Sequence, residues 1–219
     1  MSYVLMRILE SAPYRYDKGI NILTLGKIGK AYDRLVENIK ENQNVLDIGC
    51  GTGMLIIRAA LKGAKITGID INPEMLEIAQ IRIKNADFTD NVIFKEIGVA
   101  ELDSFEENEF DVIMSGLCFS ELSEDELNYT LKFSKKLLKQ NGLMIIVDEV
   151  KSKSFFFRFL NFIIRIPLVI ITYILTQTTS RAIKGLEKKV TKAGFKIESI
   201  KRNRLRNFIE LTAKNIKEN

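Results

Sequence analysis

The chain has 219 residues, of which 46% are hydrophobic and 28% charged, and its formal net charge is +5. This composition is typical of a globular protein with one well-buried core rather than of a disordered chain. Histidine is absent and there are two cysteines, so Ser/His/Asp triads, Cys/His nucleophile pairs and zinc sites are excluded or nearly so. We therefore expect no metal site.

Taken in chain order, apolar runs of strand length alternate with segments of helical period. The expected strands are 44–49, 64–70, 91–97, 110–116, 142–148, 195–200 and 208–214. The expected helices are 54–63, 73–86, 124–140 and 181–194, the last ended by Gly194 as a C-terminal cap. This alternation predicts an α/β fold, a Rossmann-like doubly wound sheet of about seven mostly parallel strands with helices on both faces. With no repeat or linker in the sequence, 1–219 is expected to be a single domain.

The ends and the charge pattern bear on location. The first residues, "MSYVLMRILESAPYRY", show no cleavage-site pattern, so a signal peptide is not expected, and the scarcity of cysteine favours a cytoplasmic protein. Basic residues are spread along the chain and become dense only in "KGLEKKVTKAGFKIESIKRNRLR". This pattern favours a solvated face over a nucleic-acid surface.

The loop after the first expected strand reads "DIGCGTG" and contains Asp47, Gly49, Gly51 and Gly53. Glycines at alternate positions let the backbone turn sharply and leave no Cβ to block a ligand, although a tight strand-to-helix turn alone would also use them. The second expected strand ends at Asp70, 21 residues after Gly49, where a carboxylate would accept hydrogen bonds from ribose hydroxyls. Together these features predict a nucleoside-containing cofactor at the carboxyl ends of the strands.

The form of this loop favours S-adenosylmethionine. A dinucleotide fold would show G-x-G-x-x-G before a helix that receives a pyrophosphate, whereas this loop has G-x-G-x-G and opens with an acid, Asp47. A carboxylate there would repel phosphate and suit the cationic amino group of a methionine moiety. An NAD-binding oxidoreductase is the more distant alternative.

At this point the chain resembles the class I S-adenosylmethionine-dependent methyltransferases. The matching blocks are "VLDIGCGTGM", "GIDINPEML", "GVAELD", "FDVIMSGLCFSEL", "KKLLKQNGLMIIVDE" and "KAGFKIESI", spread over most of the chain. The resemblance implies a transferase with an N-terminal helical lid over 1–40. It also implies the cofactor-binding residues Tyr16, Asp47, Gly49, Cys50, Gly51, Gly53, Asp70, Ile71, Val99, Ala100, Ser115 and Gly116.

Within this set, the resemblance assigns each part of the cofactor to a different segment. The loop at 47–53 would hold the methionine end and Asp70 the ribose, while Ile71 and the pair 99–100 would border the adenine. Residues 115–116 would close the site near the methyl group, and Tyr16 would reach it from the lid. Val99 stands where the family usually has an acid, which puts the contact with the adenine amino group in doubt, and "QNG" replaces the commoner Pro-Gly-Gly turn.

A narrower resemblance concerns the methyl acceptor. The first 28 residues, with "SGLCFSELSEDE" and "LTQTTS", look like the corrinoid protein-associated methyltransferases, which would make a corrinoid protein the partner and a reduced cobalt centre or a side chain of that protein the acceptor. A small-molecule acceptor is the alternative to this partner. A lipid-like acceptor at a membrane surface and a non-catalytic S-adenosylmethionine-binding module are further alternatives. A homodimer also remains open.

The sequence assigns no catalytic residue. A thiolate or low-valent cobalt needs no general base, whereas a hydroxyl or amine would need Asp148, Glu121, Glu149 or a tyrosine. Each acid also has a structural explanation. Asp148 and Glu149 would cap the segment that follows the fifth strand, and Glu121 would share a capping arrangement with Ser123. Both cysteines are expected to pack rather than react. The "NPPY"-type sequence of nucleic-acid amino methyltransferases is absent, which argues against nucleic acid as the acceptor.

The stretch 154–177, "SFFFRFLNFIIRIPLVIITYILTQ", is the most apolar part of the chain. Its polar residues fall on one side of a helical wheel, Arg158 and Arg165 would be costly inside a membrane span, and Pro167 should break the helix. We therefore expect a helical cap over 151–178, made of two short helices that cover the acceptor pocket. A helix at a membrane surface, a partner-docking face and a true span are the alternatives. The two arginines would bind the acceptor or face solvent.

Overall fold

A computed structural model describes residues 16–17, 20–21, 24, 26–151, 182–204 and 206–216. The apolar stretch 154–177, nearly all of the cap predicted over 151–178, and residues 1–15 of the predicted lid lie outside the described residues. Among the described residues, no helix combines the length and the apolar character that crossing a membrane would need.

The core of the molecule is one seven-stranded sheet in the order β3-β2-β1-β4-β5-β7-β6. The pairs among β1 to β5 are parallel, and β7 runs antiparallel to its neighbours β5 and β6. The strands are β1 Asn44–Ile48, β2 Lys65–Asp70, β3 Val92–Glu96, β4 Phe110–Gly116, β5 Leu138–Glu149, β6 Phe195–Arg202 and β7 Phe208–Asn215. The prediction of a seven-stranded, mostly parallel α/β sheet is confirmed. Strand order reverses between β1 and β4, which is where open α/β sheets bind ligands.

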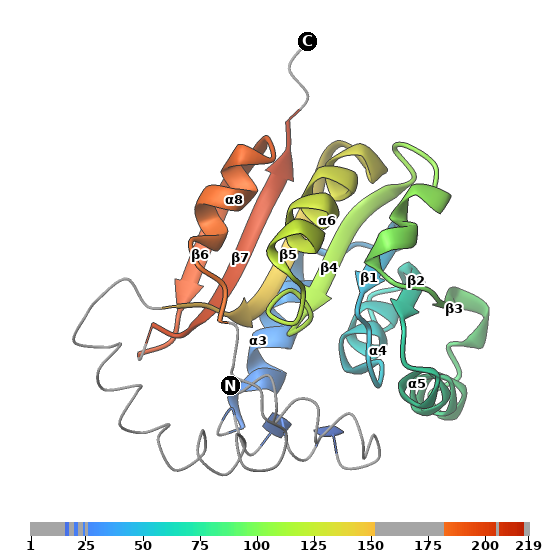
Figure 1. Ribbon diagram of the computed structural model, residues 1–219. Helices are drawn as coiled ribbons and strands as arrows, with labels where there is room; N and C mark the ends of the chain where they lie inside the picture. The colour runs from blue at the N-terminus through green and yellow to red at the C-terminus, as the bar shows by residue number, and fades with distance from the viewer. Residues whose placement is uncertain are drawn as a thin grey trace.

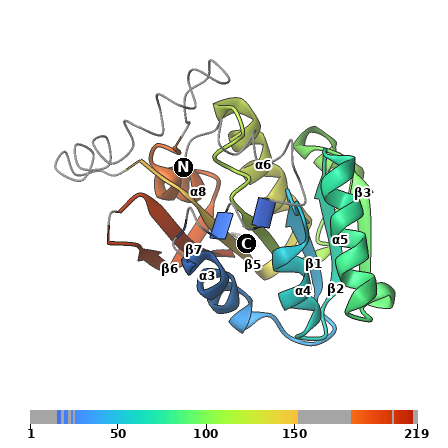
Figure 2. The same ribbon diagram turned by 90° about the horizontal axis from the view of Figure 1, so that it is seen from below.

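Helices cover both faces of this sheet (Figures 1 and 2). The helices are α3 Lys27–Leu35, α4 Met54–Ala60, α5 Pro73–Asn85, α6 Glu124–Leu137 and α8 Leu186–Lys192, and the 3₁₀ turns are η1 Val36–Asn38, η2 Thr89–Asn91 and η3 Val99–Ser104. Residues of α3, α4 and α5 share one buried cluster with Val45, and residues of η3, α6 and α8 share the other with Leu46. Successive residues of β1 thus face opposite layers, as the two-residue period of a strand requires.

Several helix boundaries differ from the sequence prediction: the helix predicted over 54–63 ends at Ala60, and strand pairing moves two further boundaries. The helix predicted to 140 ends at Leu137, because Leu138 is already extended and pairs with Phe110 of β4. The pairing then shifts register before Leu143, near Asn141 with its positive φ of 66°. The helix predicted from 181 begins at Leu186, because Gly185 before it is left-handed and Ile183 forms a parallel bridge with Val150, the residue after β5. Tertiary pairing outweighs the helical period at both places.

Capping at the start of α6 corrects another expectation. Ser123 Oγ accepts a hydrogen bond from the backbone N–H of Glu126 at 3.2 Å, and Glu126 Oε2 accepts one from the N–H of Ser123 at 2.7 Å. The capping partner is therefore Glu126 rather than Glu121, because the side chain three residues after the cap reaches back to it.

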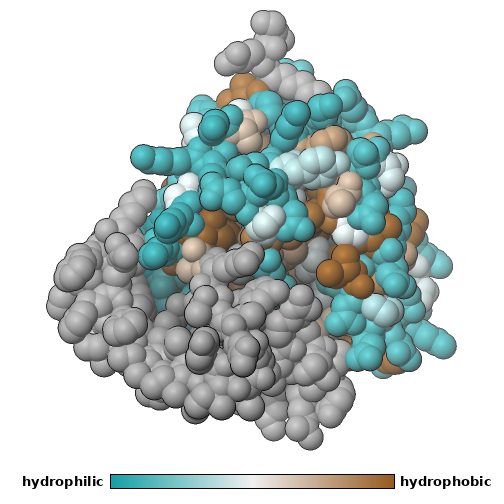
Figure 3. Space-filling model, viewed as in Figure 1, coloured by the Kyte–Doolittle hydropathy of each residue, from teal (hydrophilic) through white to brown (hydrophobic). Residues whose placement is uncertain are grey.

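Gly194, with φ of +90°, follows the end of α8 as predicted. The described surface over α6 and α8 is mainly hydrophilic (Figure 3).

Candidate functional site

The loop after β1 turns through three glycines with positive φ, at Gly49, Gly51 and Gly53. A Cβ on Gly49 would lie 2.5 Å from the Cβ of Cys118, so this position admits no side chain without displacement. Gly53 precedes α4, and a Cβ there would lie 3.1 Å from Ala79 of α5, so this glycine lets two helices approach. A Cβ on Gly51 would meet nothing within 4 Å, which leaves the loop backbone open on that side.

Asp47, the last but one residue of β1, is the unusual polar group of the site. It is 1% exposed, and neither carboxylate oxygen has a hydrogen-bond partner among the described residues. Burial, together with the negative charge of Asp70, raises the pKa of the Asp47 carboxyl. A buried carboxylate without a partner is costly, and a cation beside it would remove that cost. Asp47 is therefore suited to bind a ligand cation such as an ammonium group.

Asp70, at the end of β2, ties the glycine loop to the start of α5. Its Oδ2 accepts a hydrogen bond from the backbone N–H of Gly51 at 2.8 Å, and its Oδ1 accepts one from the N–H of Asn72 at 2.9 Å. Burial raises the pKa of the Asp70 carboxyl, while these N–H groups act in the opposite direction. Each oxygen of a carboxylate can accept a second hydrogen bond, so the group retains capacity for ligand hydroxyls.

Two cavities meet at the glycine loop. The first, of about 490 Å³, lies against α3 and α4 and is lined by residues that include Asp47, Cys50, Tyr32 and Arg58. The second, of about 730 Å³, lies on the other side of the loop and is lined by residues of β2, η3 and the start of α6. The residues that line both cavities are Tyr16, Gly49, Gly51 and Gly116.

Most of the predicted cofactor residues lie at these cavities. Asp70, Ile71, Val99 and Ala100 line the second cavity, the predicted ribose and adenine side. Gly53 and Ser115 line neither: Gly53 supports the start of α4, and the Ser115 hydroxyl donates a hydrogen bond to the carbonyl of Ile48 at 2.9 Å, joining β4 to β1.

The candidate general bases are distributed unevenly. Glu121 lines the second cavity, Tyr32 lines the first, and Tyr16 lines both. Asp148 and Glu149 are buried and line neither cavity. The Asp148 carboxylate accepts hydrogen bonds from the backbone N–H groups of Ser120 at 3.1 Å and Glu149 at 2.6 Å, so it fastens the loop after β4 to β5.

Both cysteines are packing residues in this arrangement. Burial raises the pKa of the Cys50 and Cys118 thiols, which disfavours the reactive thiolate. The Cys50 sulfur fills the space left by Gly68 of β2, where a Cβ would lie 3.1 Å from that sulfur and 2.5 Å from Cδ1 of Ile56. The packing interpretation from the sequence agrees with these contacts.

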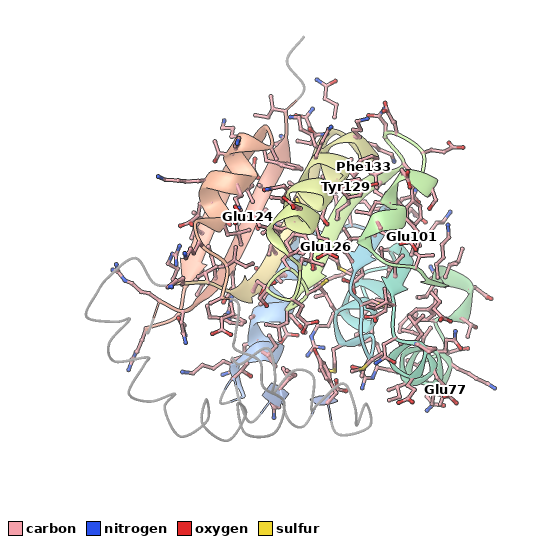
Figure 4. All side chains as sticks on the ribbon, viewed as in Figure 1. Glu77, Glu101, Glu124, Glu126, Tyr129 and Phe133 are labelled. Carbon is pink, nitrogen blue, oxygen red and sulfur yellow. The ribbon has the colours of Figure 1, made fainter. Side chains whose placement is uncertain are left out.

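The edge of the second cavity is braced by α6. Tyr129 stacks on Phe133 with ring centroids 4.3 Å apart, and its hydroxyl donates a hydrogen bond to the carbonyl of Ala100 at 3.2 Å. Figure 4 shows Glu126 and Tyr129 on α6 across from Glu101 of η3. Glu101 accepts a hydrogen bond from the N–H of Gly98 at 3.0 Å, which fixes the turn that carries Val99.

Sequence reasoning missed several residues of the first cavity. Tyr32 of α3 lies so close to Gly116 that a Cβ on this glycine would be 2.5 Å from the tyrosine hydroxyl. Burial, with nearby carboxylates including Asp47, raises the pKa of Tyr32, so it remains a phenol at neutral pH. Thr52, Arg58 and Asp17 also line this cavity. Tyr32 and Arg58 belong to α3 and α4, whose patterns are those of ordinary amphipathic helices, so the sequence carries no separate signal for them.

The sheet order, the glycine loop at its switch point and the two acids define a class of protein, the Rossmann-like methyltransferase fold. A family model described as "Methyltransferase domain" matches residues 39–196, more than half of the chain. The chain therefore belongs to this methyltransferase domain family, and the prediction of an S-adenosylmethionine-dependent methyltransferase domain is confirmed at the level of the family.

Individual similarities are consistent with this assignment. A demethylmenaquinone methyltransferase of Thermotoga maritima is 30% identical over 147 residues, 65% of this chain and 60% of that protein. Two solved structures show the fold: the cyclase SpnF, with a TM-score of 0.70 and 17% identity over 86% of this chain and 80% of that one, and a 1,6-didemethyltoxoflavin-N1-methyltransferase of Burkholderia thailandensis, with a TM-score of 0.67 and 19% identity over 96% and 88%. The chain spans about half the length of the curated relatives it matches, such as 55% and 53% of two of them.

Proposed function

We propose that this protein is an S-adenosylmethionine-dependent methyltransferase whose first cavity receives the methionine end of the cofactor and whose second cavity receives the adenosine. The buried Asp47 carboxylate, without a partner among the described residues, carries this proposal. It lies in the first cavity, while Asp70 lies in the second, and the two cavities share the open backbone of Gly51. This separation of two acids by one glycine loop matches a ligand with an ammonium group at one end and ribose hydroxyls at the other.

The residues present fit each part of such a ligand. Asp47 would accept hydrogen bonds from the ammonium group, which would give its buried charge a partner. Asp70 would accept hydrogen bonds from the ribose hydroxyls with the capacity that Gly51 and Asn72 leave free. Ile71 and Val99 would contact the faces of the adenine with apolar side chains, since both line the second cavity.

The chemistry requires little of the protein beyond positioning. When bound, S-adenosylmethionine supplies an electrophilic methyl group on its sulfonium sulfur. Tyr32, whose pKa is raised, would act as a hydrogen-bond donor rather than a base. A hydroxyl or amine acceptor would lose its proton to Glu121 in the second cavity, whereas an acceptor with its own electron pair, such as a thiolate or low-valent cobalt, would need no base.

The acceptor we propose is a group on a corrinoid protein or a small molecule that carries such an electron pair. This rests on the resemblance of the sequence to corrinoid protein-associated methyltransferases and on the absence of histidine. A lipid-like acceptor at a membrane surface would depend on 154–177, which lies outside the described residues. A cytoplasmic location and a homodimer remain predictions.

A non-catalytic S-adenosylmethionine-binding module is the second candidate. The observations that favour it are Val99, which stands where the family usually has an acid, and the lack of an assigned general base. Fold alone does not determine the reaction, because chemistry is set by the site that the fold carries. The two candidates predict the same cofactor binding and differ only in turnover.

Calorimetric measurement of S-adenosylhomocysteine binding to the wild-type protein tests the cofactor binding that both candidates predict. Asp47→Asn should weaken binding about tenfold or more, because the amide cannot compensate an ammonium charge. It should leave the apo protein at least as stable at pH 8, because it removes an unpaired buried charge. Glu77→Gln on the surface of α5 is the control and should change neither quantity. A wild-type protein that does not bind S-adenosylhomocysteine would refute the proposal.

Turnover separates the two candidates. Protein incubated with methyl-labelled S-adenosylmethionine is offered a reduced corrinoid protein, a panel of thiols and a panel of hydroxylated aromatic compounds. Transfer of label to the corrinoid protein or to a small molecule supports the methyltransferase and identifies the acceptor class. Tight binding without transfer to any acceptor supports the binding module.

A further inference from the structure

Arg82 of α5 joins three parts of the molecule that are far apart in the sequence. Its Nη1 donates hydrogen bonds to the carbonyl oxygen of Thr52 at 2.6 Å and to the Thr52 hydroxyl at 3.2 Å. Its Nη2 forms an ion pair with Asp17 of the N-terminal segment. The Thr52 hydroxyl in turn donates to the Asp17 carboxylate at 2.5 Å. The three side chains therefore form a closed set of hydrogen bonds.

This set is better shielded from solvent than an ordinary surface ion pair. Thr52 is 2% exposed, and the side chains of Arg82 and Asp17 are 23% and 30% exposed. Partly buried charge-assisted hydrogen bonds are screened less by salt and hold a defined geometry better than exposed ones do. The second hydrogen bond of each partner further restricts its rotation.

The position of the set relative to the cavities suggests its role. Asp17 and Thr52 line the first cavity and do not line the second, whereas Arg82 lines neither. Tyr16, next to Asp17 in the chain, lines both. Arg82 thus contacts two residues that line the first cavity, although it does not line the cavity itself. It also neutralises Asp17, which leaves Asp47 as the carboxylate of that cavity available to a ligand cation.

We propose that Arg82 is a positioning residue for the methionine end of the cofactor, acting through Asp17 and Thr52. This inference rests on the proposed function, which assigns the methionine end to the first cavity. It makes a selective prediction, because a ligand that lacks the methionine chain would occupy only the second cavity. Loss of the set should weaken binding of S-adenosylhomocysteine and leave binding of 5′-methylthioadenosine unchanged.

The test measures the Kd of both ligands by calorimetry for the wild-type protein, Arg82→Gln, Asp17→Asn and the double variant. Each single substitution should raise the Kd for S-adenosylhomocysteine about tenfold, or about 1.4 kcal/mol, and change that for 5′-methylthioadenosine less than twofold. The double variant should bind S-adenosylhomocysteine no more weakly than the weaker-binding single variant, because both single substitutions break the same set of hydrogen bonds. Lys84→Gln, an exposed cation on the same helix, is the matched control and should behave as wild type.

The outcomes separate this inference from the function on which it rests. A wild-type protein that binds both ligands equally would refute the assignment of the first cavity to the methionine end, and the role of Arg82 with it. A wild-type protein that prefers S-adenosylhomocysteine, with variants that keep this preference or lose affinity for both ligands equally, would overturn the role of Arg82 alone. If Arg82→Gln does not fold, Asp17→Asn and Arg82→Lys carry the test, and the lysine variant should show an intermediate loss because one ammonium cannot reach both partners at guanidinium geometry.

Discussion

Replacing Asp148 by asparagine should change how the stability of the protein depends on pH. The Asp148 side chain is fully buried, and burial raises its pKa from 3.8 to about 7. The folded state therefore keeps the proton between pH 4 and 7, whereas the unfolded state has lost it. The contribution of this proton to stability is present below pH 3.8 and is lost as the pH rises through 7.

The size of the effect follows from the shift. About three pKa units at 1.36 kcal/mol each give about 4 kcal/mol of stability lost by the wild type between pH 4 and pH 8. Asparagine has no proton to lose at this position. It also offers one acceptor where the carboxyl offers two to the N–H groups of Ser120 and Glu149, which costs about 1 to 3 kcal/mol at every pH. Asp148→Asn should thus be less stable than wild type at pH 4.5 and gain up to about 4 kcal/mol relative to it by pH 8.

Urea unfolding at pH 4.5, 6 and 8 measures this difference, with Asp87→Asn, an exposed acid, as the control. Effects of other titrating groups cancel in the comparison of variant with wild type. The reasoning would be refuted by stability curves of wild type and Asp148→Asn that stay parallel over this range.

Two further predictions concern packing and capping. Gly49→Ala should lower the free energy of unfolding by about 2 to 5 kcal/mol, because the backbone at this position is left-handed and the new Cβ would be forced against Cys118. Urea unfolding measures this loss, and adding Cys118→Gly should restore part of it. A double variant as unstable as Gly49→Ala would contradict the role of this contact. Ser123→Ala should cost about 1 kcal/mol by removing the cap of α6, and an unchanged urea midpoint would contradict it.

The central strands β1, β4 and β5 could be predicted from the sequence because most of their residues are buried on both faces of the sheet. A run such as Val45–Ile48 is continuous in burial, and such runs have no competing helical period. The predicted helix boundaries were wrong where the local sequence pattern and the tertiary strand pairing disagree. Leu138 continues a helical period, yet it pairs with Phe110 of β4 instead. No local signal records that partner, which lies far away in the sequence.

The candidate site could be predicted where backbone geometry requires particular residues. Gly49 and Gly51 take positive φ angles, and the acid at the end of β2 hydrogen-bonds to the loop itself, so local sequence carries their signal. Tyr32 and Arg82 could not be found in this way. They come from helices whose patterns are ordinary, and their importance arises only when the fold brings them to Gly116 and Asp17.

The fit of the Cys50 sulfur into the space beside Gly68 links two positions that are distant in the sequence. Enlarging residue 68 by one methyl group would require a smaller residue at 50, a shift of Ile56, or both. Any redesign of the glycine loop must therefore vary residues 50, 56 and 68 together, because they meet in the same space. The glycine loop after β1 is in this sense constrained by the packing of the neighbouring strand β2.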